Sequence, residues 1–431
     1  MSMGNRSAQE NRQSPGNKAR LAEIRRRHRM RKLRVTVVCI VLTAMIFAYF
    51  MGAFGAPLAL MGDMVDSLKI SMMPGAGFPV DFTLTGYITA DTLSGGFVAL
   101  GDRELMIYSS HGNLLRRIPH GYARPCMTAG SSRVCIYSRG DTELTVESRT
   151  RNLVTRTFDN PILLAEMSEN GMLAVFTKNQ LEVFDPLFES IWTWNNVSEL
   201  PLAMAFGDDN KKLAVASLSA SGGAIGTTLH FFSTRSEKEQ ATVTVPDGVP
   251  VKMQYRGGRL LVIYDSFAAL YSASGQEVAR YDYGVRQLQS ASVDSAGRTA
   301  LLFGAQHYPG ITGFVTLDAS LTEMGTASVR SNVNSIAMAD KTVYILANGA
   351  VLHYALTGEL IEKLPMDTKP LAVLDAKDPL LVTAKSVSAL KIRRAAATGA
   401  SSASGAQQGS DTGQAAEPPD ASQSVASDAA A

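Results

Sequence analysis

The residues best suited to acid–base, nucleophilic or metal chemistry are few and widely spaced in this sequence. Its six histidines show no spacing typical of metal ligands. His230 and His307 each lack the paired acid that a catalytic histidine would use. No phosphate-binding glycine loop or nucleophile elbow is present. The sequence therefore predicts no catalytic residue, no metal site and no cofactor.

Two of the three cysteines lie close together in the sequence. Cys126 and Cys135 flank the turn Gly130-Ser131-Ser132, at positions that could face each other across a hairpin, whereas Cys39 lies in an apolar run. A disulfide between Cys126 and Cys135 is possible if this part of the chain lies outside the cytoplasm. Two buried free thiols are the alternative, and the sequence favours neither.

Two long polar connections are the best candidates for a binding surface. They are SLSASGGAIGTT, residues 217–228, and GAQHYPGITG, residues 304–313. Exposed loops on a rigid scaffold commonly carry function, although a tolerated insertion is the simpler alternative. The candidate binding residues in these two loops are Ser219, Ser221, Gly222, Gly223, Gln306, His307 and Tyr308.

The elements that would position these loops form a repeat. Residues 162–194 contain four apolar, β-rich runs separated by turns, and similar units recur along the chain. A period of about 40 residues is typical of four-stranded propeller blades. The copies are predicted to begin near residues 88, 125, 162, 201, 249, 288, 333 and 370. We therefore predict an all-β chain that forms a β-propeller of eight blades, with seven as the main alternative because the first copy is weakly defined.

The two ends of the repeat array complement each other. The last copy, PLAVLDAKDPLLVTAKSVSALKI, supplies three strands, and residues 80–85 form a lone β-like run before the first copy. We predict that this N-terminal run becomes the fourth strand of the last blade, because such closure leaves no unpaired radial edge. In this closed ring the two long connections belong to blades 4 and 6. Both join a second strand to a third strand, so they should open on one surface.

The sequence on either side of the repeats predicts a membrane anchor. Residues 1–34 hold eleven Lys and Arg against two Glu, and residues 35–54 contain no charge. At 1.5 Å per residue the uncharged run would span roughly 30 Å, so it is predicted to be one transmembrane helix. The basic cluster predicts a cytoplasmic N-terminus with everything after the span outside. A cleaved signal peptide is the alternative.

These observations divide the chain into five parts. We predict a basic, disordered cytoplasmic segment at 1–34, the transmembrane helix at 35–54, a juxtamembrane stalk at 55–77, the propeller at 78–394 and a disordered low-complexity tail at 395–431. The propeller itself has a slight excess of acidic residues, so nucleic acid is not an expected partner.

Some blades resemble known repeat families. In LHYALTGE, residues 352–359, the aromatic residue and the Thr-Gly turn resemble a quinoprotein-like repeat, and the general pattern also resembles WD40-like repeats. Trp194 is the one counterpart of the tryptophan of quinoprotein blades, so no quinone is expected. The basic N-terminus, span, stalk and propeller together resemble an uncharacterised family of membrane-anchored β-propellers of Gram-positive, clostridial bacteria. That resemblance implies a fold and a location, and no catalytic residues.

The function that we predict is that of an anchored binding scaffold. The protein would cross the cell membrane once, and its extracytoplasmic propeller would bind a protein or a cell-wall component. The alternative is an enzyme or a small-ligand sensor that uses the central funnel of the propeller. A polar, concave pocket with converging acids and bases would favour the alternative, and a flat or apolar loop face would favour the scaffold.

Overall fold

The computed structural model describes most of the chain from residue 77 to residue 390. Within this range it leaves out 179, 196–199, 222–223, 305–311 and 331, and before it describes 43, 62, 65, 66, 68–70 and 72–75. All of these residues belong to the unit Met1–Lys391, and the second unit, Ile392–Ala431, lies outside the described residues. The predicted cytoplasmic segment, nearly all of the predicted span and the predicted tail also lie outside them. Within the described part of the chain, no helix is long and apolar enough to cross a membrane.

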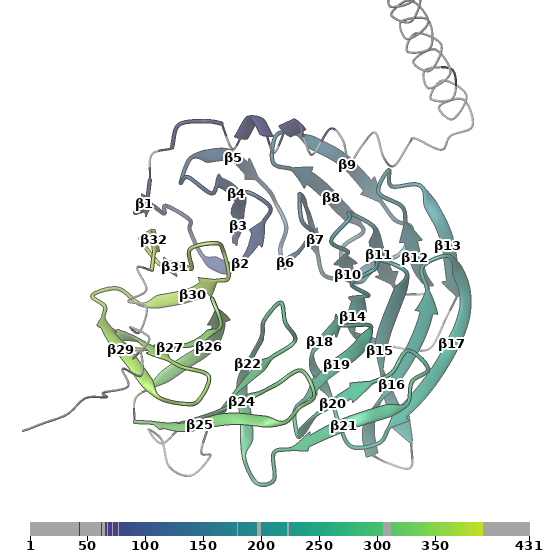
Figure 1. Ribbon diagram of the computed structural model, residues 1–431. Coiled ribbons are helices and arrows are strands. Elements are labelled where there is room, and N and C mark those ends of the chain that lie inside the picture. Colours follow the sequence, from purple (N-terminus) through teal and green to yellow (C-terminus); the bar gives the residue numbers. More distant parts are fainter. Residues whose placement is uncertain are drawn as a thin grey trace, which may run out of the picture. The chain divides into compact units, whose positions relative to one another are not determined.

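Eight four-stranded antiparallel sheets surround a central channel, with the first strand of each blade innermost (Figure 1). The predicted fold class, including the number of blades, is therefore confirmed. Each predicted copy begins within one residue of an observed innermost strand. The middle strands are apolar on both faces because blades cover them from both sides. The outermost strands alternate between exposed and partly buried residues.

The first four blades are continuous in the sequence. Blade 1 contains β2 (Tyr87–Leu93), β3 (Gly96–Gly101), β4 (Glu104–Ser109) and β5 (Leu114–Pro119). Blade 2 contains β6 (Pro125–Ala129), β7 (Arg133–Ser138), β8 (Glu143–Ser148) and β9 (Asn152–Thr157). Blade 3 contains β10 (Ile162–Met167), β11 (Leu173–Thr177), β12 (Gln180–Phe184) and β13 (Ser190–Asn195). Blade 4 contains β14 (Leu200–Phe206), β15 (Lys212–Ser221), β16 (Ala224–Ser233) and β17 (Ser236–Val245).

The next three blades repeat this order, and the last one combines both ends of the array. Blade 5 contains β18 (Pro250–Arg256), β19 (Arg259–Tyr264), β20 (Phe267–Tyr271) and β21 (Glu277–Asp282). Blade 6 contains β22 (Gln287–Val293), β23 (Thr299–Gly304), β24 (Thr312–Leu317) and β25 (Glu323–Val329). Blade 7 contains β26 (Val333–Ala339), β27 (Thr342–Ala347), β28 (Ala350–Tyr354) and β29 (Leu360–Pro365). Blade 8 contains β30 (Pro370–Leu374), β31 (Leu380–Thr383), β32 (Ser386–Ala389) and β1 (Val80–Asp81).

Closure of the ring uses the N-terminal strand, as the sequence predicts. In blade 8, Val80 of β1 pairs with Val387 of β32, and the Phe82 amide donates a hydrogen bond to the Lys385 carbonyl oxygen at 2.8 Å. Gly112, in the turn after β4, packs against this junction. Its φ is +82°, and a Cβ added there would lie 2.6 Å from a Val80 methyl group. Glycine is therefore required beside the closing strand.

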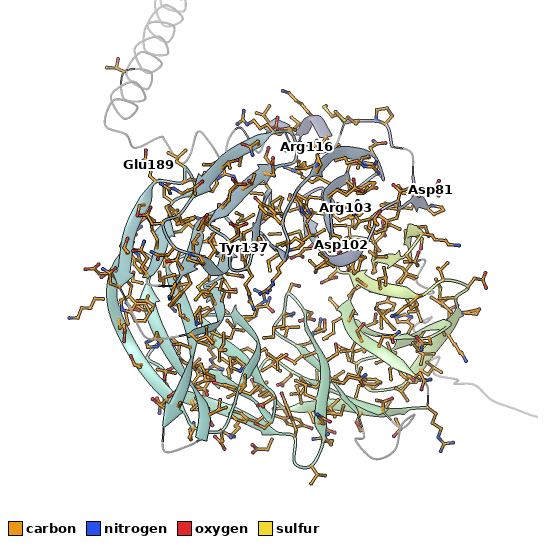
Figure 2. The ribbon with its side chains drawn as sticks, turned by 180° about the vertical axis from the view of Figure 1, so that it is seen from behind. Asp81, Asp102, Arg103, Arg116, Tyr137 and Glu189 are labelled. Carbon is orange, nitrogen blue, oxygen red and sulfur yellow. The ribbon has the colours of Figure 1, made fainter. Side chains whose placement is uncertain are left out.

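Hydrophobic clusters fill every interface between neighbouring blades, and the side chains drawn in Figure 2 occupy these spaces. Between blades 8 and 1, the rings of Phe97 and Tyr108 stack with their centroids 4.8 Å apart. Between blades 3 and 4, Trp192 and Trp194 pack against Phe232, with centroids 5.6 and 5.1 Å away. The two tryptophans therefore belong to the packing between blades.

The two ends of the channel differ in the turns that surround them. Because successive strands are antiparallel, the turns between first and second strands all lie at one end, which we call the channel end. The turns between second and third strands lie at the other end, which we call the hairpin end. Asp102 and Arg103, labelled in Figure 2, form one of these turns at the hairpin end.

The segment that precedes β1 attaches to the channel end. The Gly77 amide donates to the His111 carbonyl oxygen at 3.0 Å, and Asn113 Nδ2 donates to the Pro74 carbonyl oxygen at 2.9 Å. Thr150 Oγ1 donates to Asp66 Oδ2 at 2.7 Å. These contacts involve the turns between the third and fourth strands of blades 1 and 2, which lie at the channel end.

Candidate functional site

The first predicted loop is largely a lengthened hairpin. Strands β15 and β16 pair continuously from Lys212 and Ser233 to Ser221 and Ala224. Ser219 pairs with Gly226, so Ser219 and Ser221 belong to a strand, which corrects the prediction that residues 217–228 form a loop. Backbone pairing satisfies the amide groups of this stretch, so it can project as a ribbon despite its many small polar residues. Gly222 and Gly223 lie outside the described residues.

The second predicted loop joins β23 to β24 in blade 6. Its candidate residues Gln306, His307 and Tyr308 lie outside the described residues. The flanking strands end at Gly304 and begin again at Thr312, which places both ends of this connection at the hairpin end. The lengthened hairpin of blade 4 projects from the same end, with one blade between them.

His230 is buried within blade 4, where its ring is packed and hydrogen-bonded. It lies on β16 and is 3% exposed, and its Nε2 is 2.9 Å from Ser217 Oγ. Its ring packs against Trp194, with centroids 5.1 Å apart. Its Nδ1 is 3.5 Å from a Glu239 carboxylate oxygen, so the prediction that His230 lacks a paired acid is wrong: β16 and β17 bring the two residues together. His230 is thus held inside blade 4, beneath the projecting hairpin.

Of the two alternatives for Cys126 and Cys135, the structure has free thiols and no disulfide. The register of β6 and β7 pairs Cys126 with Tyr137 and Cys135 with Thr128, so the two cysteines are diagonal neighbours and do not face each other. Both thiols are free. Cys135 is fully buried, and burial raises the pKa of its thiol well above the ordinary range. The sequence located the hairpin correctly but misjudged its register by two residues.

One face of the lengthened hairpin is apolar. Leu200 pairs with Leu218 across β14 and β15, and Ala220 pairs with Ile225 across β15 and β16. Cross-strand partners and alternate residues share a face of a sheet, so these four side chains form one strip, which we call the apolar strip. Leu200 is 49% exposed and Ile225 is 64% exposed.

The apolar strip continues the core between blades 4 and 5. Ala214 and Ala216, on the same face of β15, are fully buried in that core, whereas Leu218 is partly exposed and Ala220 is exposed. Two exposed aliphatic residues of blade 5, Val251 and Val285, lie at the same end of the disk. Several other exposed aliphatic residues lie singly at the starts of outermost strands, as Leu114 and Leu360 do, and such scattered residues are ordinary. Val65 and Leu68 are also exposed, in the segment that precedes β1.

The channel end holds a polar cavity of about 550 Å³ to which all eight innermost strands contribute. Asp91 on β2, Glu166 on β10, and Lys252 and Gln254 on β18 line it. These strands belong to blades 1, 3 and 5. Small side chains line other parts of the wall and leave room beside the polar groups: Ala90, Ala129, Ala205 and Ser292.

The charged groups of this cavity influence one another. Burial raises the pKa of Glu166 to about 8, and the negative charge of Asp91 adds to this shift, although Thr128 Oγ1 donates to Glu166 Oε2 at 3.2 Å. Burial also raises the pKa of Asp91, which the Lys252 ammonium opposes. The pKa of Lys252 is lowered by burial and by Arg256, and the Asp91 carboxylate opposes this change.

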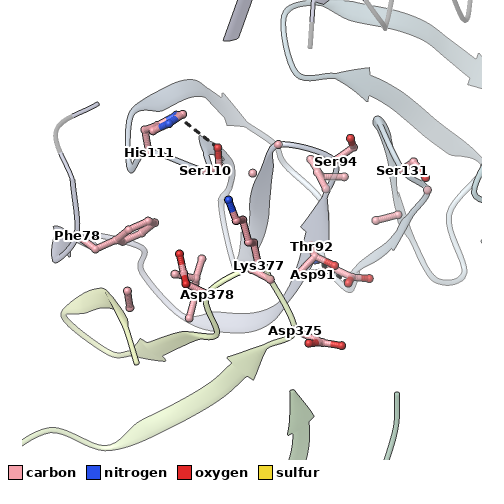
Figure 3. A pocket seen from close by; sticks show the side chains of 18 of the residues that line it. Phe78, Asp91, Thr92, Ser94, Ser110, His111, Ser131, Asp375, Lys377 and Asp378 are labelled. Carbon is pink, nitrogen blue, oxygen red and sulfur yellow. Dashed lines mark hydrogen bonds between the residues drawn. The ribbon is translucent and has the colours of Figure 1, made fainter. Parts of the chain in front are cut away.

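A second cavity of about 770 Å³ opens beside the first, between blades 8 and 1 (Figure 3). Lys377 and Asp378, from the turn after β30, lie on one side, and Ser110 and His111, from the turn after β4, lie on another. Asp91 borders both cavities. No group of three or more His, Cys, Asp or Glu among the described residues is arranged to hold a metal ion.

The alternative function placed a ligand in the central funnel, but no residue of the polar channel was predicted, although the sequence contains a signal for these residues. The innermost strands of a propeller are mostly small or apolar, as in β14 and β30. A charged residue in the middle of a first strand is therefore unusual, and Asp91, Glu166 and Lys252 each occupy such a position. Comparing the first strands of the copies would have identified the three residues.

Comparison with protein families agrees with the repeat and its limits. A family model described as "Family of unknown function (DUF5711)" matches residues 80–392. The chain belongs to this family. The matched range begins at β1 and ends just after β32, so the DUF5711 domain comprises the closed ring of eight blades. No curated protein matches the sequence.

Solved structures share the propeller architecture of this DUF5711 chain at low sequence identity. The computationally designed Ika8 protein is 13% identical with a TM-score of 0.56, covering 72% of this chain and 99% of that one. BamB from Moraxella catarrhalis is 13% identical with a TM-score of 0.51, covering 72% and 95%. Sqt1 from Saccharomyces cerevisiae is 10% identical with a TM-score of 0.53, covering 74% and 100%. These similarities establish the fold.

Proposed function

We propose that this protein is a membrane-anchored, extracytoplasmic scaffold whose hairpin end binds a protein partner. The observation that carries the proposal is the apolar strip. Aliphatic side chains gathered on a projecting element are typical of protein–protein contacts. A propeller supplies the rigid support that keeps such a surface in one geometry. The polar cavity at the channel end, with Asp91, Glu166 and Lys252, meets the criterion for a small-ligand site and favours ligand binding as a second function at that end.

The attachment of the N-terminal segment supports the orientation. Asp66, Pro74 and Gly77 contact the turns of blades 1 and 2 at the channel end. A span at 35–54 would therefore connect to that end, and the hairpin end would point away from the bilayer toward its partner. The resemblance to membrane-anchored propellers of Gram-positive bacteria supports the same location, and the anchor remains a prediction.

The partner-binding proposal is tested by crosslinking and pull-down from membranes. We expect the double variant Leu200→Ser/Ile225→Ser to lose most of the partner that the intact protein captures, because it removes the two most exposed side chains of the apolar strip. The matched control is Leu114→Ser/Leu360→Ser, which changes two leucines of similar exposure at the starts of outermost strands. Equal capture by the two double variants would show that the strip is not the binding surface.

Deletion of residues 218–227 gives a second, coarser test of the same surface. This deletion removes the projecting part of the hairpin and should abolish capture. Unchanged partners after the deletion would contradict the choice of the hairpin end. Circular dichroism of the deletion variant would establish that the remaining blades are folded.

The predicted topology has a separate test. A reporter that is active only outside the cytoplasm, fused after Arg394, should be active in the intact protein. A reporter at that position that works only in the cytoplasm would overturn the orientation without affecting the partner-binding proposal.

A further inference from the structure

The polar cavity contains opposite charges on opposite sides of the channel. In a ring of eight blades, blade 5 lies across the axis from blade 1, and Figure 1 shows β18 and β2 in these positions. Lys252 on β18 therefore faces Asp91 on β2. The two groups interact electrostatically, but among the described residues they form no ion pair within 4.0 Å. The space between them can hold a ligand.

Several polar groups of this cavity have unused bonding capacity. Lys252 Nζ makes no hydrogen bond to any described residue, although an ammonium can donate three. Gln254 Oε1, two residues along the same strand, is buried without a hydrogen-bond partner among the described residues. Asp91 Oδ1 accepts one hydrogen bond, from the adjacent Thr92 amide at 2.7 Å. A buried polar oxygen without a partner costs free energy, which a bound donor would recover.

The nature of these groups selects among small polar ligands. The ammonium of Lys252 needs an anionic acceptor, whereas Asp91 and Gln254 need donors, of which a cationic one suits Asp91 best. A neutral sugar would supply hydrogen bonds but would leave both charges unpaired. A simple anion or a simple cation would pair with one charge and repel the other. A ligand that carries a negative and a positive charge a few bonds apart would pair with Lys252 on one side of the channel and with Asp91 on the other.

We propose that the channel binds the α-amino-acid head group of a small ligand, with its carboxylate at Lys252 and its ammonium at Asp91 and Gln254. The cavity of about 550 Å³ has room for the head group and a substituent. Glu166, on blade 3 between the two walls, holds its proton at neutral pH because its pKa is raised to about 8, so it does not compete with the Asp91 carboxylate for the ligand's ammonium. Arg256 and Asp208 also line the cavity and pair with each other at 3.1 Å, whereas Glu169 and Asp375 add negative charge that favours the ligand's ammonium.

Two sources could supply this head group. One is a free amino acid. The other is a diamino-acid side chain that ends in the same ammonium and carboxylate within a larger envelope peptide. Both carry the same head group, and the cavity is open enough at the channel end to admit either one. Binding experiments with both ligands therefore distinguish the two sources.

Isothermal titration calorimetry on the full-length protein in detergent tests the site. The probes are L-alanine, D-alanine, and an N-acylated, C-amidated peptide whose diamino-acid side chain ends in the head group. Propionate and ethylamine, which each carry one of the two charges, are the controls. We expect saturable binding of alanine or of the peptide, whichever is the source, and binding at least about tenfold weaker for both controls, a difference of about 1.4 kcal/mol.

Variants connect the binding to the named residues. Lys252→Met and Asp91→Asn should each weaken binding by about tenfold or more, because each leaves one ligand charge unpaired. Lys363→Met, at an exposed position on β29, is the matched control and should bind as the intact protein does. Thermal melting of each variant establishes that it is folded.

Three results would overturn the proposal. They are the absence of saturable binding by alanine and the peptide, propionate or ethylamine binding as tightly as either, and unchanged binding by folded Lys252→Met. The variant Leu200→Ser/Ile225→Ser should bind the head group normally, so the channel site and the proposed partner surface can fail independently.

Discussion

The two ends of the propeller offer different kinds of surface. The channel end is concave and polar, and its key side chains, such as Asp91 and Lys252, project from the innermost strands of different blades. The hairpin end carries the apolar strip, which lies on two strands that outgrow their own blade. Recognition at the channel end would depend on charge placed by the ring as a whole. Recognition at the hairpin end would depend on apolar area presented by one blade.

The apolar strip also shows how one sheet can serve two purposes. Inside the disk, the face of β15 with Ala214 and Ala216 is covered by blade 5. Beyond the disk, the same face continues through Leu218 and Ala220 without cover. The apolar residues beyond the disk are therefore not needed to hold the blades together, which supports the proposed partner surface.

The first prediction contrasts the covered and uncovered parts of this sheet. Phe231 on β16 is 1% exposed and packs in the core between blades 4 and 5. Phe231→Ala should lower the free energy of unfolding by about 3–5 kcal/mol, because it removes a buried ring and leaves a cavity. Urea denaturation would measure the change. A loss below about 1 kcal/mol would mean that the packing between blades 4 and 5 does not support the hairpin.

The second prediction uses pH to examine the channel end. The folded protein holds the Glu166 proton up to about pH 8, whereas the unfolded chain releases it near the ordinary value of 4.5. Between these values the unfolded state binds fewer protons, so stability should fall as pH rises, by at most about 1.4 kcal/mol per pH unit. Glu166→Gln should remove this contribution. Urea denaturation between pH 5 and pH 8 would measure the free energy of unfolding of both proteins. The two values should be similar near pH 5 and should differ increasingly toward pH 8, where the variant is the more stable protein.

The third prediction concerns a turn at the channel end. Asp340 and Lys341, between β26 and β27, both have positive φ, at 45° and 60°. A left-handed conformation costs a lysine roughly 1–2 kcal/mol, and glycine avoids this cost but loses about 0.5–1 kcal/mol through its greater freedom in the unfolded chain. Lys341→Gly should therefore stabilise the protein by about 0.5–1 kcal/mol in thermal or chemical denaturation. A destabilised variant would mean that the lysine side chain makes a compensating contact.

The fourth prediction has the smallest expected effect and completes the contrast with Phe231. Ile225→Ala, at the tip of the hairpin, should change the free energy of unfolding by no more than about 0.5 kcal/mol, because Ile225 is 64% exposed. The same denaturation assay applies. A loss of 2 kcal/mol or more, the lower range for a buried isoleucine, would show that the strip is covered within the protein itself and is not a free surface.

The sequence predicted the architecture well because each blade, except the closing one, is formed by a contiguous stretch with a recognisable pattern of strands and turns. Apolar runs such as LAVFT and turns such as Glu169-Asn170-Gly171 recur at a regular period, and the lone run at residue 80 indicated how the ring closes. These features depend on neighbours within one blade, which a single sequence displays directly.

The candidate site was harder to predict because it depends on register and on contacts between distant blades. Ser219 and Ser221 have weak strand propensity, so their stretch reads as a loop until its pairing with Gly226 and Ala224 is known. Cys126 and Cys135 differ from a facing pair by a shift of two residues. Asp91 and Lys252 face each other across the channel because eight blades close the ring, and no local sequence pattern contains that information.

The attachment of the N-terminal segment has a mechanical consequence. Strand β1 is held in blade 8 by two residue pairs, fewer than hold the outermost strand of any other blade. A force that pulls on the chain before Gly62 reaches Asp66, Pro74 and Gly77 first, and their bonds to blades 1 and 2 must break before β1 carries any load. These contacts therefore carry an applied force first, and they protect the pairing between β1 and β32 from it.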